Sequence, residues 1–308
     1  MSRLIRVSSS PNSSITRDES ILIAFIAFFR LNQLMMSASE YKSISRLVYE
    51  KFGIDLGANK RTLVENRLAP VINQLGFINF QEYYAHIISD KSGQSLLELA
   101  NRLTTNYSFF FRELEHLERL KEILPTRLQQ TSTWRNASLS IWSAGCSGGE
   151  EPYSLSIILK ELSTLHSFAK WDLGILGTDI DTNKLKEAHR GIYPTDRLRA
   201  IPSNIRTQYF KQVDQLLWQV KESTKQCVHL SRFNLMEKQF NFKGKFFIIF
   251  CRNVMIYFNR ATIKTLIQRF YEVTEDGGYL FIGLTESLDK KDCPYDYIAP
   301  SVYQKRVR

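Results

Sequence analysis

A chain of 308 residues has room for about two domains of ordinary size. With 44% hydrophobic and 23% charged residues it has the composition of a globular protein, and its net charge of +10 indicates an acidic partner: a nucleic acid, an anionic membrane or an acidic protein surface. The four cysteines lie far apart and form no C-x-x-C pair, which argues against a zinc site or a disulfide framework and favours a reducing cytosol.

We expect residues 1–34 to be a poorly ordered extension, with folding beginning near Met35 or Met36. The apolar run at residues 21–29 follows basic residues but is too short to span a bilayer, which takes about 20 residues. A signal peptide is the alternative, disfavoured because Arg30 follows at once and no small-residue cleavage site is evident.

Residues 35–125 are predicted to form a small all-α domain, since no strand pattern interrupts four helical patterns. These patterns cover residues 40–52, 63–75, 79–88 and 96–103. Lys60, Arg61 and Arg67 fall on the polar side of the second helix. They form either a solvated face or a docking surface for acidic helices.

The stretch at residues 103–113, Leu-Thr-Thr-Asn-Tyr-Ser-Phe-Phe-Phe-Arg-Glu, has neither helix nor strand periodicity. Such a segment joins two domains or lines a pocket. Arg112 beside the aromatic run would be partly desolvated, where a guanidinium is useful only if it meets a carboxylate. A connecting helix should follow and end at Pro125, with residues 126–136 as a linker into the second domain.

Residues 141–154 predict a strand, a tight glycine loop and a helix, as at the first crossover of a doubly wound sheet. Gly145 would let the backbone turn sharply or approach a ligand. Glu150 and Glu151, where the helix begins, would repel a pyrophosphate but suit hydroxyl and ammonium groups. S-adenosylmethionine offers such groups, although a plain strand-to-helix turn would also explain the loop.

The second strand of the predicted sheet ends in Gly-Thr-Asp-Ile-Asp at residues 177–181. An acidic residue at this place typically accepts hydrogen bonds from ribose hydroxyls, a role that we assign to Asp179. Asp181 is predicted to cap the next helix. The alternative is that both are plain loop acids.

Two short apolar runs, residues 216–220 and 228–230, predict an antiparallel hairpin in a small β subdomain at about residues 210–231. Parallel order should resume at residues 245–251, an apolar run typical of a strand covered on both faces. The polar side chains that follow, Arg252, Asn253 and Tyr257, are expected in the ligand crevice. Residues 302–305 are predicted to be the last edge strand.

From about residue 40 to its end, the chain resembles the CheR-type chemotaxis methyltransferases. The resemblance rests on Thr-Thr-Asn-x-Ser-x-Phe-Phe-Arg-Glu, Ser-Ala-Gly-Cys-Ser-x-Gly-Glu-Glu-Pro-Tyr-Ser, Thr-Asp-Ile-Asp, Phe-Asn-Leu, Cys-Arg-Asn-Val-Met-Ile-Tyr-Phe and Gly-Gly-Tyr-Leu-Phe-Ile-Gly, in family order. It implies a Rossmann-like α/β methyltransferase domain at residues 137–308, with a small antiparallel β insertion and a preceding all-α domain. The implied reaction, in the cytoplasm, transfers methyl from S-adenosyl-L-methionine to chemoreceptor glutamates and releases S-adenosyl-L-homocysteine.

The same resemblance implies roles for individual residues. Arg112 and Tyr257 would be catalytic. The residues that would bind the cofactor are Asn106, Ser108, Arg112, Gly145, Glu150, Asp179, Asn234, Leu235, Arg252 and Asn253. No metal is expected.

The implied partners are the acidic cytoplasmic helices of chemoreceptors, docked on the basic second helix, and in some relatives a receptor C-terminal peptide bound at the β subdomain. Neither nucleic acid nor stable membrane insertion is expected. Three departures from the family pattern stand out: Ser108 replaces a usual threonine and keeps the hydroxyl, Gly148 replaces a common threonine, and Leu284 stands where a histidine is usual.

Two other functions are compatible with the pattern. One is an enzyme acting on nucleic acid, and the absence of the Asp/Asn-Pro-Pro-aromatic signature argues against it. The other is a non-catalytic S-adenosylmethionine sensor, and the retention of Arg112 and Tyr257 argues against it.

Overall fold

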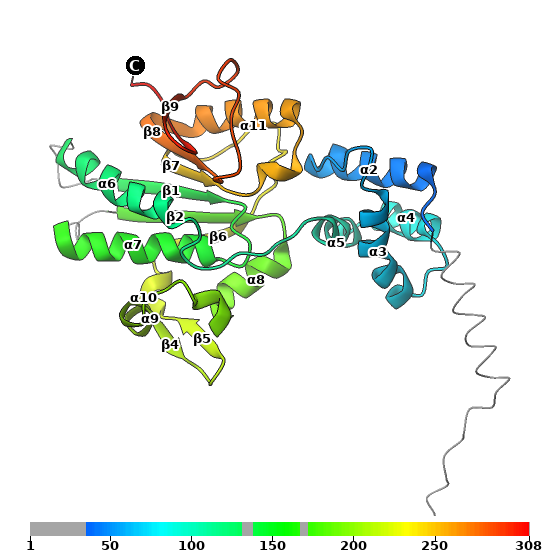
Figure 1. Cartoon of the computed structure of the whole chain (residues 1–308), viewed down its shortest axis with the longest axis horizontal. Helices are drawn as coiled ribbons and strands as arrows, with labels where there is room; N and C mark the ends of the chain where they lie inside the picture. Colours follow the sequence, from blue (N-terminus) through cyan, green and yellow to red (C-terminus); the bar gives the residue numbers. More distant parts are fainter. Residues whose placement is uncertain (1–34, 131–137, 167–171, 308) are drawn as a thin grey trace, which may run out of the picture.

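The computed structural model describes residues 35–130, 138–166 and 172–307. The predictions for residues 1–34 and for the linker at residues 131–136 therefore lie outside the described residues. Within them, a helical domain lies at one end of an α/β domain, as predicted (Figure 1).

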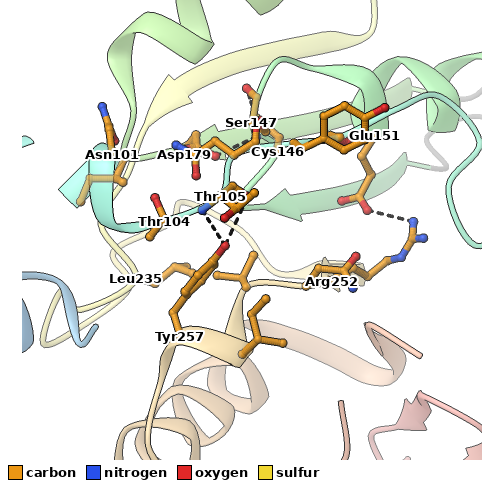
Figure 2. Close-up of a pocket in the computed structure, with 18 of the residues that line it drawn as sticks. Asn101, Thr104, Thr105, Cys146, Ser147, Glu151, Asp179, Leu235, Arg252 and Tyr257 are labelled. Atoms are coloured by element: carbon orange, nitrogen blue, oxygen red, sulfur yellow. Dashed lines mark hydrogen bonds and ion pairs between the residues drawn. The ribbon is translucent and has the colours of Figure 1, made fainter. Parts of the chain in front are cut away.

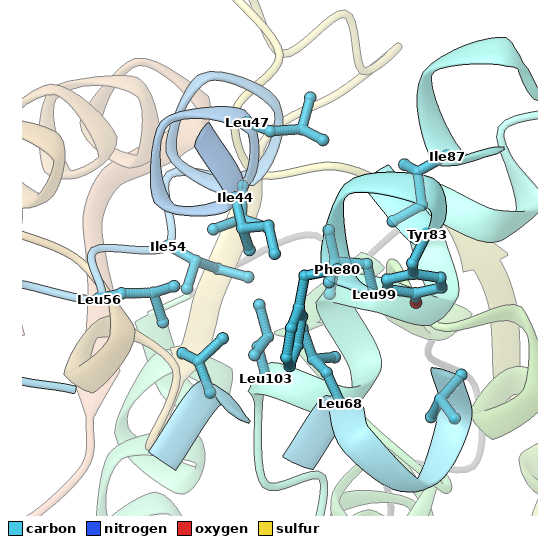
Figure 3. Close-up of a cluster of buried hydrophobic side chains, with 14 of the residues drawn as sticks. Ile44, Leu47, Ile54, Leu56, Leu68, Phe80, Tyr83, Ile87, Leu99 and Leu103 are labelled. Atoms are coloured by element: carbon cyan, nitrogen blue, oxygen red, sulfur yellow. The ribbon is translucent and has the colours of Figure 1, made fainter. Parts of the chain in front are cut away.

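The helical domain contains α2 (Ala38–Phe52), α3 (Arg61–Leu75), α4 (Phe80–Ser89) and α5 (Gln94–Leu103). The side chains of Ile44, Leu68 and Phe80 are fully buried in its core (Figure 3). A capping box begins α2, where Ser37 Oγ accepts from Glu40 N and Glu40 Oε2 accepts from Ser37 N. The apolar faces that the periodicity indicated thus pack on one another.

The main sheet has the strand order β6-β2-β1-β7-β8-β10-β9. Its strands are β1 (Ser138–Ala144), β2 (Asp172–Asp179), β6 (Val228–Arg232), β7 (Phe246–Cys251), β8 (Thr274–Ile282), β9 (Asp296–Ala299) and β10 (Val302–Gln304). Five adjacent strands, β6, β2, β1, β7 and β8, run parallel to one another. Strand β10 is antiparallel to both β8 and β9. The prediction that residues 302–305 form the edge is wrong, because β9 pairs with the outer side of β10.

Helices cover both faces of this sheet. They are α6 (Leu114–Gln130) and α7 (Glu150–His166) on one face, α11 (Arg260–Val273) on the other, and α8 (Thr182–Arg190) beside β2 and β6. The connecting helix does not end at Pro125, and residues 126–130 are helical rather than linker. Leu117, Leu120 and Leu124 of α6 are buried against the sheet, and this burial outweighs the one hydrogen bond lost at proline.

A second, three-stranded antiparallel sheet has the order β3-β5-β4. It consists of β3 (Ile192–Pro194), β4 (Phe210–Gln212) and β5 (Leu217–Val220), with η2 (Thr195–Leu198), α9 (Ser203–Tyr209) and α10 (Glu222–Lys225) nearby. A small antiparallel insertion was correctly predicted, but its bounds and its hairpin were not, because the sheet spans residues 192–220 rather than about 210–231. Val228 and the rest of β6 pair in parallel with β2, because α10 carries the chain from the small sheet to the open side of β2.

No helix among the described residues is both long and apolar enough to cross a membrane. Likewise, the described residues contain no group of three or more His, Cys, Asp or Glu side chains suited to holding a metal ion.

Candidate functional site

A pocket of about 340 Å³ opens where β1, β2 and β7 end. Because β1 lies between β2 and β7, the connections after β1 and β7 leave the sheet in different directions, and this is where open α/β sheets bind ligands. The helical domain supplies further lining through Phe52 and Ile54. The end of α5 also lines the pocket, where Asn101 is seen in Figure 2. The pocket therefore lies between the two domains.

The glycine loop after β1 is fixed to the end of β2. The N–H groups of Gly145 and Cys146 each donate to Thr178 O over 2.8 Å. Gly145 has a φ of +82°, and a Cβ there would lie 2.4 Å from Val254 Cγ2. Only glycine therefore permits this close approach of the loops after β1 and β7.

Asp179, at the tip of β2, faces the pocket (Figure 2). Its carboxylate accepts from Ser147 N at 2.7 Å and from Asp181 N at 2.9 Å. Burial raises the pKa of Asp179, against the effect of these two hydrogen bonds. Each carboxylate oxygen can accept a further hydrogen bond, so Asp179 is suited to gripping a pair of hydroxyls.

The structure corrects one predicted cofactor residue, Glu150. Its side chain is 3% exposed, does not line the pocket and pairs with Arg197 over 2.9 Å. Burial raises the pKa of Glu150. Glu151 lines the pocket instead, because consecutive residues at the start of α7 point in directions about 100° apart.

Arg252, at the end of β7, is held by two carboxylates. Glu113 Oε2 accepts from Nε at 3.2 Å and from Nη2 at 3.1 Å, and Glu151 Oε2 accepts from Nη1 at 3.0 Å. Nη2 also donates to the carbonyl of Arg112. With its side chain 3% exposed, Arg252 is a buried cation that is paired with both acids.

Glu113 is the centre of this network. Besides Arg252, it accepts from Asn253 Nδ2 and Leu284 N at 3.3 Å each, and His116 Nδ1 lies 3.2 Å away. Burial acts to raise the pKa of Glu113, but His116, Arg252 and Asn253 outweigh it and lower the pKa to about 2. Glu113 is therefore ionised throughout the neutral range.

Tyr257, from η3 (Met255–Tyr257), reaches across to the segment between the domains. Its hydroxyl accepts from Thr105 N at 2.8 Å and lies 3.2 Å from Thr105 O (Figure 2). Glu286, from the turn after β8, holds the same loop by accepting from the N–H groups of Asn253 and Ile256 at 3.0 and 3.1 Å. Burial raises the pKa of Glu286.

Arg112 also lines the pocket, with its Nη1 donating to Tyr107 O at 3.3 Å and its guanidinium 5.8 Å from the centre of the Phe109 ring. Unlike Arg252, it has no carboxylate among its contacts within the described residues. The remaining predicted residues also line the pocket: Asn106, Ser108, Gly145, Asp179, Asn234, Leu235, Arg252, Asn253 and Tyr257.

Sequence reasoning assigned no role to Glu113, Thr105 or Ser147, and of the two acids at the start of the helix it named Glu150 rather than Glu151 as the cofactor contact. Glu113 closes the first family motif and Glu151 lies within the second, so position in a motif was the available signal. Their contacts join segments up to 152 residues apart, which local patterns do not reveal.

The pocket fits S-adenosylmethionine in the kinds of groups that it presents. Asp179 is a partly buried acceptor for hydroxyls, and Ile180, Phe233 and Leu235 offer apolar surface for a base. Because Gly145 has no side chain, the main chain of the glycine loop can lie close to Val254 and line the pocket.

Comparison with known proteins agrees with this geometry. Residues 106–302 match the model of the CheR methyltransferase SAM-binding domain, and residues 39–104 match that of the CheR methyltransferase all-alpha domain. The chemotaxis protein methyltransferase of Borreliella burgdorferi is 38% identical over 278 residues, which is 90% of this chain and 97% of that protein. Its counterpart in Salmonella typhimurium is 32% identical over 274 residues, covering 88% and 91%.

The two matches follow one another along the chain and meet within the segment that joins the two domains and lines the pocket. The protein is thus an S-adenosylmethionine-dependent methyltransferase of the CheR family.

Proposed function

We propose that the protein transfers the methyl group of S-adenosylmethionine to glutamate side chains of chemoreceptors, giving glutamate methyl esters and S-adenosylhomocysteine during chemotactic adaptation. The observation that carries the choice of a carboxylate acceptor is the state of the two pocket arginines. Arg252 is already held by Glu113 and Glu151, whereas the contacts of Arg112 among the described residues include no carboxylate. Arg112 is therefore the arginine available to an incoming acid.

The reaction needs little acid-base assistance from the protein. A glutamate carboxylate is ionised near pH 7, and the bound cofactor supplies an activated methyl group. The task left to the chain is alignment in a site with little water. Arg112 would position carboxylates, and Tyr257, fixed to the main chain of Thr105, would hold the acceptor side of the pocket.

The remaining cofactor contacts follow from the lining. Asp179 would accept the ribose hydroxyls, Leu235 would pack on the adenine, and Asn106 and Ser108 would contact the cofactor from the segment between the domains. Asn234 has a structural duty as well, because its Nδ2 donates to Lys51 O in the helical domain at 3.0 Å.

For the partner, we favour acidic receptor helices docked on the exposed basic residues at the start of α3, Lys60 and Arg61, with the reaction in the cytoplasm. Arg67 is engaged within the protein, so the docking surface is smaller than the three residues expected from the sequence. A receptor C-terminal peptide could be held in addition at the small β sheet.

The test is transfer of labelled methyl from S-adenosylmethionine to receptor cytoplasmic fragments, measured as base-labile methanol release. Base-labile label on receptor glutamate is the expected result. If the cofactor binds but no label is transferred to receptor fragments of the same organism, the proposal fails and the protein is a cofactor-binding sensor.

A further inference from the structure

The basic side chains of α3 are of two kinds. Lys60 and Arg61 are exposed at the start of the helix, whereas Arg67 is partly buried and directed at the segment that leaves α5. Its Nη1 donates to Leu103 O at 2.5 Å, and its Nη2 donates to Thr105 Oγ1 at 3.0 Å. A side chain so engaged is poorly placed to dock a partner.

Leu103 is the last residue of α5, and its carbonyl is among the four that a helix leaves without a partner in the helix itself. A cation at this end also offsets the negative end of the helix dipole. The two contacts of Arg67 therefore fix the point at which the chain stops being helical and begins to line the pocket.

Thr105, whose side chain contacts Arg67, is also held through its main chain by a residue of the pocket, Tyr257. The Tyr257 hydroxyl contacts both its N–H and its carbonyl, and Thr104 and Thr105 line the cavity (Figure 2). One residue thus connects Arg67 of the helical domain with Tyr257 of the α/β domain.

We propose that Arg67 is a positioning residue: through Thr105 it holds Tyr257 and the segment between the domains in the form that binds the cofactor. This role rests on the proposed function only for the identity of the ligand. It differs from docking in that it acts without any receptor present.

The fork of the guanidinium matters, since two nitrogens of one side chain reach two acceptors at once. Lysine keeps the charge but offers a single nitrogen. Arg67→Lys should therefore preserve a docking role and impair a positioning role.

The experiment measures S-adenosylhomocysteine affinity by calorimetry on the full chain without receptor. Arg67→Gln and Arg67→Lys should each weaken binding about tenfold or more, the size expected for losing a hydrogen bond from a charged donor. Arg61→Gln, which removes the same charge from the same helix, should leave the affinity unchanged.

A double-mutant cycle tests the route. If Arg67 acts through Tyr257, the double variant Arg67→Gln, Tyr257→Phe should lose much less affinity than the product of the fold-losses of the two single variants. Native circular dichroism and thermal unfolding identify any variant that has lost its fold, and Arg67→Lys is then the variant that decides.

Wild-type affinity in Arg67→Lys, or effects that multiply fully in the cycle, would overturn the proposal. A wild-type protein that binds no S-adenosylhomocysteine would instead contradict the proposed function, so the two failures are distinguishable.

Discussion

Glu113 shows how one carboxylate can organise a site without lining its pocket. It is 13% exposed and holds Arg252 and Asn253, two side chains at the end of β7 that line the pocket. Its own φ of +53° is unusual for a residue other than glycine. The hydrogen bonds that converge on its carboxylate hold it in this conformation.

Glu113→Gln is expected to lower the free energy of unfolding at pH 7 by about 3 kcal/mol, the linkage value for a pKa moved from 4.5 to about 2. Because the folded pKa is lowered, this stability is present above about pH 4.5 and lost as the pH falls towards 2. Urea unfolding at several pH values should show the gap between variant and wild type closing below pH 4.5.

The matched control for that experiment is Glu115→Gln, which changes an exposed acid two residues further on and should have little effect. Equal stability of Glu113→Gln and wild type at pH 7 would show that the network adds no stability.

Arg112→Ala is expected to reduce turnover at least about tenfold, equivalent to about 1.4 kcal/mol of transition-state stabilisation, because the acceptor carboxylate loses its cationic partner. Steady-state methyl transfer to receptor fragments measures it. Arg102→Ala, which removes an exposed arginine of α5, is the control. Turnover close to that of wild type would exclude Arg112 from the mechanism.

At the scale of elements, the sequence predicted well what depends on local pattern. Periodicity located α2 to α5, Gly53 ends α2 with a φ of +71°, and Asp181 caps α8 by accepting from Asn183 N and Lys184 N. The polar residues after β2 and β7 were placed correctly in the pocket for the same reason, since a strand end has a known position in this kind of sheet.

What the sequence did not reveal depends on distant partners. The pairing of β6 with β2 joins residues more than 50 positions apart, and nothing in residues 228–230 distinguishes that partner from β5. The choice between Glu150 and Glu151 depends on where α7 begins, because a shift of one residue turns each side chain by about 100° around the helix axis. Glu113 gains its partners from β7 and from the turn after β8.

A substitution at Pro125 tests whether α6 continues through this residue to Gln130. Pro125→Ala should raise the free energy of unfolding by about 2 kcal/mol, because proline inside a helix costs about 3 kcal/mol and restricts the unfolded chain by up to about 1 kcal/mol. Urea unfolding measures it, with Pro294→Ala, outside any helix, as the control. A neutral or destabilising effect at Pro125 would contradict a helix continuous to Gln130.

At the scale of the whole molecule, the net charge of +10 should act on the encounter with an acidic receptor rather than on the enclosed cofactor pocket. Raising the salt concentration from about 50 to about 300 mM should increase the KM for receptor fragments severalfold, because it shortens the range over which charges act. S-adenosylhomocysteine affinity should change much less.

Lys60→Glu should increase that KM and flatten its salt dependence, whereas Lys291→Glu, an exposed lysine of the other domain, should do so less. Equal effects of the two substitutions would show that net charge matters and that α3 is not the docking surface.

The segment that begins at Thr104 has a consequence for exchanging domains between relatives. The two family matches meet at residues 104–106, so this looks like the natural place to join the helical half of one enzyme to the catalytic half of another. Yet Thr105, at that seam, touches Arg67 on one side and Tyr257 on the other. A hybrid protein joined at this segment takes Arg67 from one parent and Tyr257 from the other. The connection through Thr105 is therefore kept only when both parents have the same residues at these three positions.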